Sequence, residues 1–174
     1  HNCDCRLEVE PVGGIWTADF TGIADLVPGT DGWVEQRADG GETDVNWRVP
    51  NPTFAVRLFD AQVEGWEWPL GADVTMTIDD PDTPKTPDYK DTQTVVVADW
   101  DPTQTHVQFD FNYVHFIEPG HEVTLSDGET TKTHTVLDLG ITDVDVDKDI
   151  VSGTAVSDTQ VDAWICEYWG CATR

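Results

Sequence analysis

Hydrophobic and polar residues alternate along most of this chain. Twelve short segments carry apolar side chains at every second position, which is typical of strands with one buried face. They are residues 6–10, 15–20, 33–37, 45–49, 54–59, 74–78, 94–97, 107–111, 122–125, 133–139, 151–155 and 161–165. Long runs of Leu, Ala, Glu and Lys are missing, so propensity also favours strands over helices. The pattern predicts an all-β fold.

Turn signals separate these segments. Pairs that favour tight turns occur at residues 13–14, 28–29, 39–40, 119–120 and 127–128, as Gly-Gly, Pro-Gly or Asp-Gly. Short strands divided by such turns at roughly 8 to 12 residues are typical of β-sandwiches.

The turn signals recur at a nearly constant spacing. Asp19-Phe20 and Pro28-Gly29 recur 91 residues later, as Asp110-Phe111 and Pro119-Gly120. Further matches lie 87 or 88 residues apart: residues 39–40 with 127–128, 42–49 with 129–136, 63–65 with 151–153, Val74 with Val161, and Ile78 with Ile165. Twice 87 equals the chain length of 174. The sequence therefore predicts two copies of a unit of about 87 residues.

One copy is predicted to be whole and the other split. Residues 54–139 form the complete domain, while residues 140–174 form the N-terminal half and residues 1–53 the C-terminal half of a second domain. Half a sandwich exposes an apolar face and unpaired strand edges, so it needs completion. Three arrangements remain open: a continuous tandem-repeat chain, separate subunits that complete each other by strand addition, or closure of both ends within one chain.

Several segments resemble the tandem immunoglobulin-like repeats of large bacterial surface and secreted proteins. The likeness is carried by residues 16–20, 26–29, 65–69, 74–78 and 131–136 and covers nearly the whole chain. It implies immunoglobulin-like β-sandwiches that serve as spacer, stalk, adhesin module or filament subunit, with no catalytic chemistry. Many such repeats lack cysteines, so the cysteines at the two ends of this chain are a departure.

The four cysteines are Cys3, Cys5, Cys166 and Cys171, an even number confined to the two ends of the chain. No CxxC pair is present, and we expect disulfides, which indicate an oxidising, extracellular or cell-surface location. A local Cys166–Cys171 bond and bonds between subunits both remain open, whereas a Cys3–Cys5 bond would be strained. A zinc site made by the cysteines, with or without His1, is a further alternative.

The charge is strongly negative. Nine Lys and Arg face 34 Asp and Glu, a formal net charge of −25, which argues against nucleic acid and anionic membrane surfaces as partners. No apolar run is long enough to span a bilayer, and a start at His1 indicates a mature or excised piece. The excess of carboxylates is typical of proteins from salt-loving organisms and of calcium-binding proteins alike.

Calcium is the one cofactor that the sequence suggests, and otherwise none is expected. Four carboxylates stand at alternate positions where a strand would place them on one face: Asp143, Asp145, Asp147 and Asp149. Lys148 occupies the position where an EF-hand loop needs glycine, so a solvated hairpin is the competing interpretation. A second acidic loop contains Asp79, Asp80, Asp82 and Asp88.

Three of the eight tryptophans suggest glycan stacking. Trp66 and Trp68 have the same parity on one predicted strand, and Trp169 lies between two cysteines. A polysaccharide-binding or adhesin module is therefore the alternative function, although core packing explains the same residues.

No catalytic signature is present. The serines and histidines lack the spacing of a nucleophile elbow, a triad or an HExxH helix, so we do not expect an enzyme. The predicted function is a structural subunit or repeat unit of an extracellular filament or long surface protein. Its partners are further copies of itself, joined head-to-tail by strand complementation or chain continuity and locked by disulfides.

Overall fold

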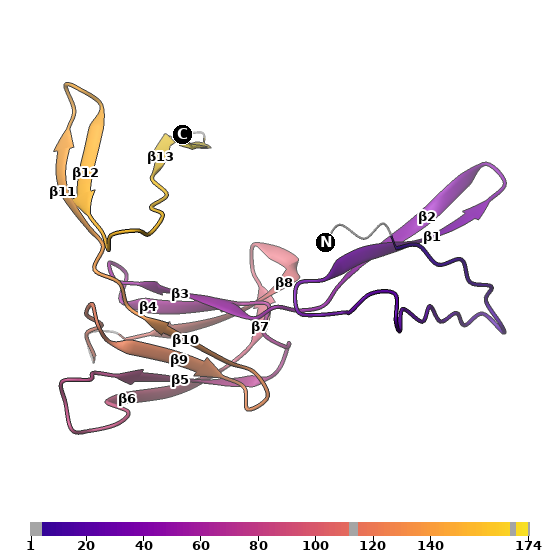
Figure 1. The fold of residues 1–174 in the computed structure, drawn as a ribbon, viewed down its shortest axis with the longest axis horizontal. Coiled ribbons are helices and arrows are strands. Elements are labelled where there is room, and N and C mark those ends of the chain that lie inside the picture. The colour runs from indigo at the N-terminus through magenta and orange to yellow at the C-terminus, as the bar shows by residue number, and fades with distance from the viewer. Residues whose placement is uncertain (1–4, 112–114, 168–169, 174) are drawn as a thin grey trace. The chain divides into compact units, whose positions relative to one another are not determined.

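The structure is a computed structural model that describes residues 5–111, 115–167 and 170–173. All regular secondary structure in this part of the chain is β-strand, arranged in antiparallel sheets (Figure 1). The prediction of an all-β fold is therefore confirmed. The chain divides into two compact units, residues 1–51 and 52–174.

Two four-stranded sheets lie between residues 53 and 136, and Figure 1 shows them stacked face to face. We call this region the sandwich. One sheet has the order β3 (Thr53–Arg57), β4 (Gln62–Trp66), β8 (Asp101–Asp110) and β7 (Val96–Ala98). The other has the order β10 (Thr131–Thr135), β9 (Glu122–Ser126), β5 (Asp73–Asp79) and β6 (Tyr89–Thr94).

The buried core lies between these two sheets. Along β5, every second residue is buried, because alternate side chains of a strand point to opposite faces. The residues of the core cluster come from both sheets and from the turns that join them: Val63, Trp68, Val74, Met76, Ile78, Val95, Val107, Phe109, Phe111, Val123, Leu125 and Val136. Every one of them lies between residues 63 and 136.

Gly65 and Trp68 show how tightly the core is filled. A Cβ atom on Gly65 would lie 2.8 Å from Trp68 Nε1 and 2.9 Å from Val107 Cγ1, so only glycine leaves room for both neighbours. The Trp68 indole is buried and donates a hydrogen bond to the Thr53 carbonyl at 3.1 Å. Glu67, with φ of 59°, reverses the alternation after β4 and turns Trp68 inward. Trp68 is thus a core residue.

The remaining strands form three separate two-stranded sheets. These hairpins are β1 (Asp31–Ala38) with β2 (Gly41–Arg48), β11 (Gly140–Asp145) with β12 (Ile150–Thr154), and β13 (Trp164–Glu167) with β14 (Gly170–Thr173). None of these pairs is joined to a third strand among the described residues.

The predicted strands at residues 6–10 and 15–20 are not strands in the structure; an isolated bridge between Val12 and Ile15 lies between them. A strand needs a hydrogen-bonded neighbour, and the alternating pattern alone does not supply one. Conversely, β4, β6, β11 and β14 were not expected. β4 and β6 lack a strong apolar alternation, since β4 contains glycine and β6 is polar at most positions.

Candidate functional site

The apolar residues of the C-terminal segment are exposed where their sandwich counterparts are buried. Val151, Val161 and Ile165 are 53%, 55% and 63% exposed. Their counterparts 87 or 88 residues earlier, Val63, Val74 and Ile78, are each 0% exposed. The same residue types therefore form a core in one region and an open apolar face in the other.

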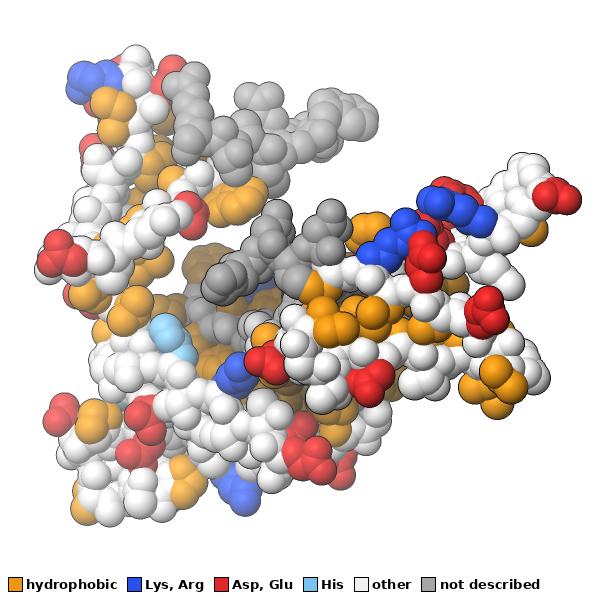
Figure 2. All heavy atoms as spheres, turned by 45° about the vertical axis from the view of Figure 1, so that its right-hand side comes forward, with side chains coloured by type: hydrophobic (Ala, Val, Ile, Leu, Met, Phe, Trp, Pro, Cys, Tyr) orange, Lys and Arg blue, Asp and Glu red, His pale blue; other side chains and the backbone are white. Residues whose placement is uncertain are grey.

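The N-terminal segment shows the same contrast. Trp16 is about half exposed, whereas its counterpart Val107 is fully buried in the sandwich. Large apolar side chains at the surface of this segment also include Val12, Ile15, Ile23, Leu26, Val27, Trp33 and Val45. Figure 2 shows hydrophobic side chains, in orange, at the molecular surface among carboxylates in red. Exposed apolar faces of this kind mark interaction surfaces in soluble proteins.

The same pattern of three backbone hydrogen bonds is found at the start of a hairpin in the sandwich and in the N-terminal segment. In the sandwich, the amide of Gly120 donates to Val136, that of Val136 to His121, and that of His121 to Glu118, at 2.9, 2.9 and 3.2 Å. In the N-terminal segment the corresponding bonds run from Gly29 to Val49, Val49 to Thr30, and Thr30 to Val27, at 2.9, 2.8 and 2.9 Å. The two hairpins therefore begin with the same backbone geometry.

The hairpins β3–β4 and β11–β12 share a pairing register. In the sandwich, Phe54 is opposite Gly65 and Val56 is opposite Val63. In the C-terminal segment, Ile141 is opposite Gly153 and Val144 is opposite Val151. The spacing changes from 87 to 88 residues within β11, where the ladder contains a bulge between Ile141 and Asp143. The bulge absorbs the extra residue, so the rest of the register is kept.

The structure describes part of the predicted cysteine set. Neither described cysteine side chain, Cys5 or Cys166, is a free thiol, since both are disulfide-bonded. Cys166 is directly opposite Cys171 in the β13–β14 ladder, although nothing is described of the Cys171 side chain. Cys3 lies outside the described residues.

The four alternating aspartates do not come together as a metal site. Asp145 ends β11 and accepts hydrogen bonds from the amides of Asp147 and Lys148, each at 3.1 Å. The Lys148 side chain also binds this carboxylate at 2.5 Å, and its hydrogen bond is the main cause that lowers the pKa of Asp145. Asp143, Asp147 and Asp149 join it in no metal-binding group, and residues 5–111, 115–167 and 170–173 contain none elsewhere. Asp145 serves the turn between β11 and β12.

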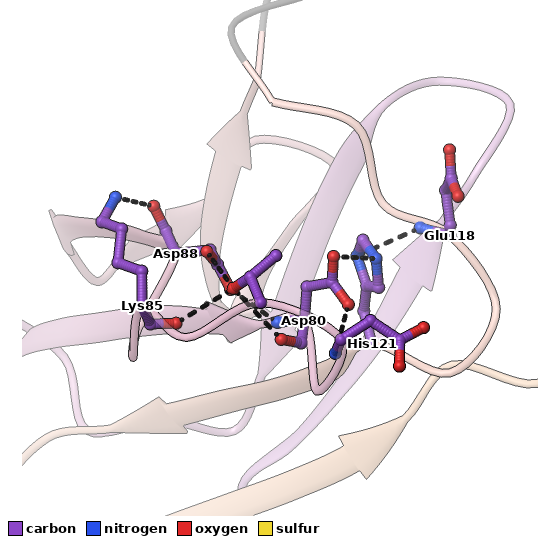
Figure 3. Close-up of polar contacts among 7 residues, drawn as sticks. Asp80, Lys85, Asp88, Glu118 and His121 are labelled. Atoms are coloured by element: carbon purple, nitrogen blue, oxygen red, sulfur yellow. Dashed lines mark hydrogen bonds and ion pairs between the residues drawn. The ribbon is translucent and has the colours of Figure 1, made fainter.

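The second acidic loop is also held by its own hydrogen bonds, as Figure 3 shows. Asp88 accepts from the Asp80 amide and the Thr83 hydroxyl, both at 2.8 Å, and these bonds lower the pKa of Asp88. Lys85 Nζ donates to the Asp88 carbonyl at 2.6 Å. His121 Nε2 lies 3.8 Å from Asp80 Oδ2. The Asp82 amide donates a hydrogen bond to the Asp80 carboxylate, and the Thr86 hydroxyl donates one to the Asp79 carboxylate. The carboxylates of this loop therefore bind groups of the loop itself.

His115 is a titratable group that the sequence did not single out. Its ring stacks on Tyr89 with centroids 5.4 Å apart, and its Nε2 is buried with no partner in the described structure. Burial lowers the pKa of His115, because a charged imidazole loses its hydration there. No sequence motif marks this position.

The two predicted glycan-stacking tryptophans that the structure describes, Trp66 and Trp68, do not form a shared platform. Trp68 is in the core, and Trp169 lies outside the described residues. Trp66 is half-buried on the opposite face of β4, with the Arg57 guanidinium 6.0 Å above its ring and His106 beside it at 6.1 Å. Trp100, 60% exposed, packs edge-on against the same His106 at 4.7 Å. Trp66 is therefore engaged by protein groups.

Comparisons of this chain with protein-family models, with curated proteins and with solved structures find no match. The described residues contain no helix with the length and apolarity needed to cross a membrane. The features that bear on function are therefore the two open apolar faces and the backbone patterns that they share with the sandwich.

Proposed function

We propose that this chain is a structural subunit of an extracellular filament or long surface protein. Its C-terminal segment, residues 140–174, and the N-terminal segment of the next unit, residues 1–53, complete each other as one immunoglobulin-like sandwich. Successive units are thereby joined head-to-tail. The proposal gives the chain a mechanical role and assigns it no catalytic chemistry.

The observation that carries the proposal is the contrast in burial at corresponding positions. Ile165 is 63% exposed, whereas Ile78 is fully buried, and the valines show the same difference. Burying an Ile or Val side chain stabilises a protein by about 1.5 to 3 kcal/mol. A surface with several such residues left open has a strong tendency to associate, and a contact that differs at its two ends propagates into a fibre.

The cysteines support an extracellular location. Disulfides persist in oxidising compartments, and the described Cys5 and Cys166 are not free thiols. We assign a cross-strand bond to Cys166 and Cys171, which are opposite each other in β13–β14. This bond would hold the hairpin that contributes Ile165 to the junction.

The test is the size and form of the purified native material at high ionic strength, which screens the repulsion between units that each carry a charge of −25. We expect filaments in negative-stain electron micrographs. On a denaturing gel, a 19.3 kDa band means separate subunits, a ladder that collapses on reduction means disulfides between them, and a very large band means a continuous chain. A monodisperse monomer at all salt concentrations would refute the proposal.

Polysaccharide binding, the alternative function, is tested by tryptophan fluorescence. Of the two predicted stacking tryptophans in the sandwich, Trp68 is buried and Trp66 is half-buried beside Arg57 and His106, so neither presents an open ring for a sugar. Titration with a panel of polysaccharides should therefore leave the tryptophan fluorescence unchanged. A saturable change in fluorescence would instead favour the adhesin function.

A further inference from the structure

We infer the register of the junction: β12 of one copy pairs with residues 15–19 of a second copy, and β13 pairs with β1 of that same second copy. This inference rests on the proposed function and adds to it which residues meet. It commits to a second, separate copy of the chain as the occupant. The reason for choosing a copy of this chain is that the repeat spacing makes residues 1–53 the counterpart of the strands that residues 140–174 lack.

The first ladder follows from β4 and β8 in the sandwich. There, Val63 is opposite Phe109 and Glu64 is opposite Gln108. Moving β4 forward by 88 residues and β8 back by 91 places Val151 opposite Ala18 and Ser152 opposite Thr17. Residues 15–20 have the alternation of a strand but no ladder of their own. Pairing with β12 would supply the missing neighbour.

The second ladder follows from β5 and β9, where Thr77 is opposite Thr124 and Ile78 is opposite Val123. A shift of 87 residues forward for β5 and of 91 back for β9 places Trp164 opposite Trp33. A shift of 88 for β1 would instead direct Glu35 inward, whereas Gly32 and Val34 are the residues of β1 that are partly buried. The burial pattern of β1 therefore selects the shift of 91.

Packing around one glycine supports this register independently. In the sandwich, Gly65 lies against Trp68 and Val107, within 3 Å of a Cβ position. The corresponding residues of the junction are Gly153, Val156 and Trp16. In the proposed register Val156 and Trp16 would therefore take the places of Trp68 and Val107 beside the glycine, a valine and a tryptophan with their positions exchanged. Swaps that preserve total volume are the ones that a packed core tolerates best.

The experiment introduces one additional cysteine into each of two copies, beside the four that the chain already contains. Unlabelled Thr17→Cys protein is mixed under oxidising conditions with ¹⁵N-labelled Ser152→Cys protein, and linked peptides are identified by mass spectrometry. Both positions are exposed in the single chain, so neither substitution disturbs a core. The matched control replaces Thr17→Cys with Thr21→Cys, a threonine that is also exposed but lies in the turn after residues 15–19 and outside the proposed ladder.

We expect a mixed-isotope link between positions 17 and 152 at least tenfold more abundant than the link from position 21. Filaments in which the two pairs link equally, or in which neither links, would overturn the register while leaving the proposed function standing. A double variant, Thr17→Cys with Ser152→Cys on one chain, that links only within that chain would overturn the second-copy occupant. Absence of any assembly in the unmodified protein would defeat the proposed function itself.

Discussion

The sandwich and the segments that flank it contain similar residues in different states. Val63 and Ile78 are fully buried, while Val151 and Ile165 are mostly exposed. The hairpins that carry Val63 and Val151, β3–β4 and β11–β12, share a register. What differs is the number of neighbouring strands, since each flanking hairpin is a sheet of two. Whether a valine or isoleucine side chain of this protein is buried therefore depends first on how many strands surround it, and only then on the type of residue.

The largest effect is expected from truncating matched isoleucines. Ile78→Ala should lower the stability of the isolated chain by about 2 to 5 kcal/mol, because it leaves a cavity in the core. Ile165→Ala should change that stability by no more than about 0.5 kcal/mol, because the side chain is exposed. Chemical denaturation of the unassembled chain measures both values.

Ile165→Ala should have a large effect once the chain assembles. If Ile165 becomes buried at a junction, Ile165→Ala should weaken association by roughly 30-fold to several thousand-fold, which corresponds to about 2 to 5 kcal/mol. The critical concentration for filament formation measures this. A critical concentration that does not change would mean that Ile165 stays exposed in the assembled state.

Much of the fold was predictable from the sequence. The alternation that marks β5 and β9 led to strands in the right places, because their inward residues are uniformly apolar. Residues 15–20 show the limit, since alternation reports which face would be buried but not whether a partner strand is available. Trp68 shows another limit, because one residue with positive φ reversed its direction.

The candidate site was predictable to a different degree. The repeat spacing alone identifies the apolar positions of residues 1–53 and 140–174 that correspond to core positions of the sandwich. Val151, which is exposed, is one of them. The aspartates at 143–149 were misleading as metal ligands, because Asp145 is engaged by the amides of its own turn. His115 was missed because its burial depends on Tyr89, a contact between residues far apart in the chain.

Reduction of the disulfides should affect the stability of the sandwich and of the junction differently, by less than the isoleucine substitutions do. All four cysteines lie outside residues 53–136, so reductant should leave the melting of the sandwich unchanged. Opening the proposed Cys166–Cys171 bond should destabilise the completed junction by about 2 kcal/mol, the value for a loop of this size. Calorimetry of filaments with and without reductant should show one transition that moves and one that does not. A lower melting temperature for the sandwich would contradict this assignment.

The tryptophan pair gives a smaller effect still. In the proposed register, Trp33 and Trp164 become cross-strand neighbours, and such aromatic pairs contribute about 0.5 to 1.5 kcal/mol beyond the area that they bury. Trp164→Leu, which removes the aromatic ring, should therefore raise the critical concentration by at least about two- to twelve-fold and change the near-ultraviolet circular dichroism of filaments. The matched control is Trp100→Leu, at an exposed tryptophan of the sandwich, which should change neither the critical concentration nor the assembly-dependent signal.

The smallest expected difference is in pH dependence, and it belongs to the sandwich alone. Every histidine except His1 lies between residues 106 and 134, and burial lowers the pKa of His115 from its ordinary value of 6.5. His121 and Lys85 lower it further, whereas Asp88 and Asp80 oppose the shift.

Because the folded pKa of His115 is below the unfolded one, unfolding takes up a proton, and stability falls as the pH drops through about 6.5. The sandwich transition should therefore move to lower temperature between pH 7 and pH 5, while the junction transition stays fixed. His115→Phe keeps a ring against Tyr89 and should remove most of this dependence. If the junction transition moved equally over this range, the completed domain would have to contain a buried histidine, which residues 1–53 and 140–174 supply only at His1.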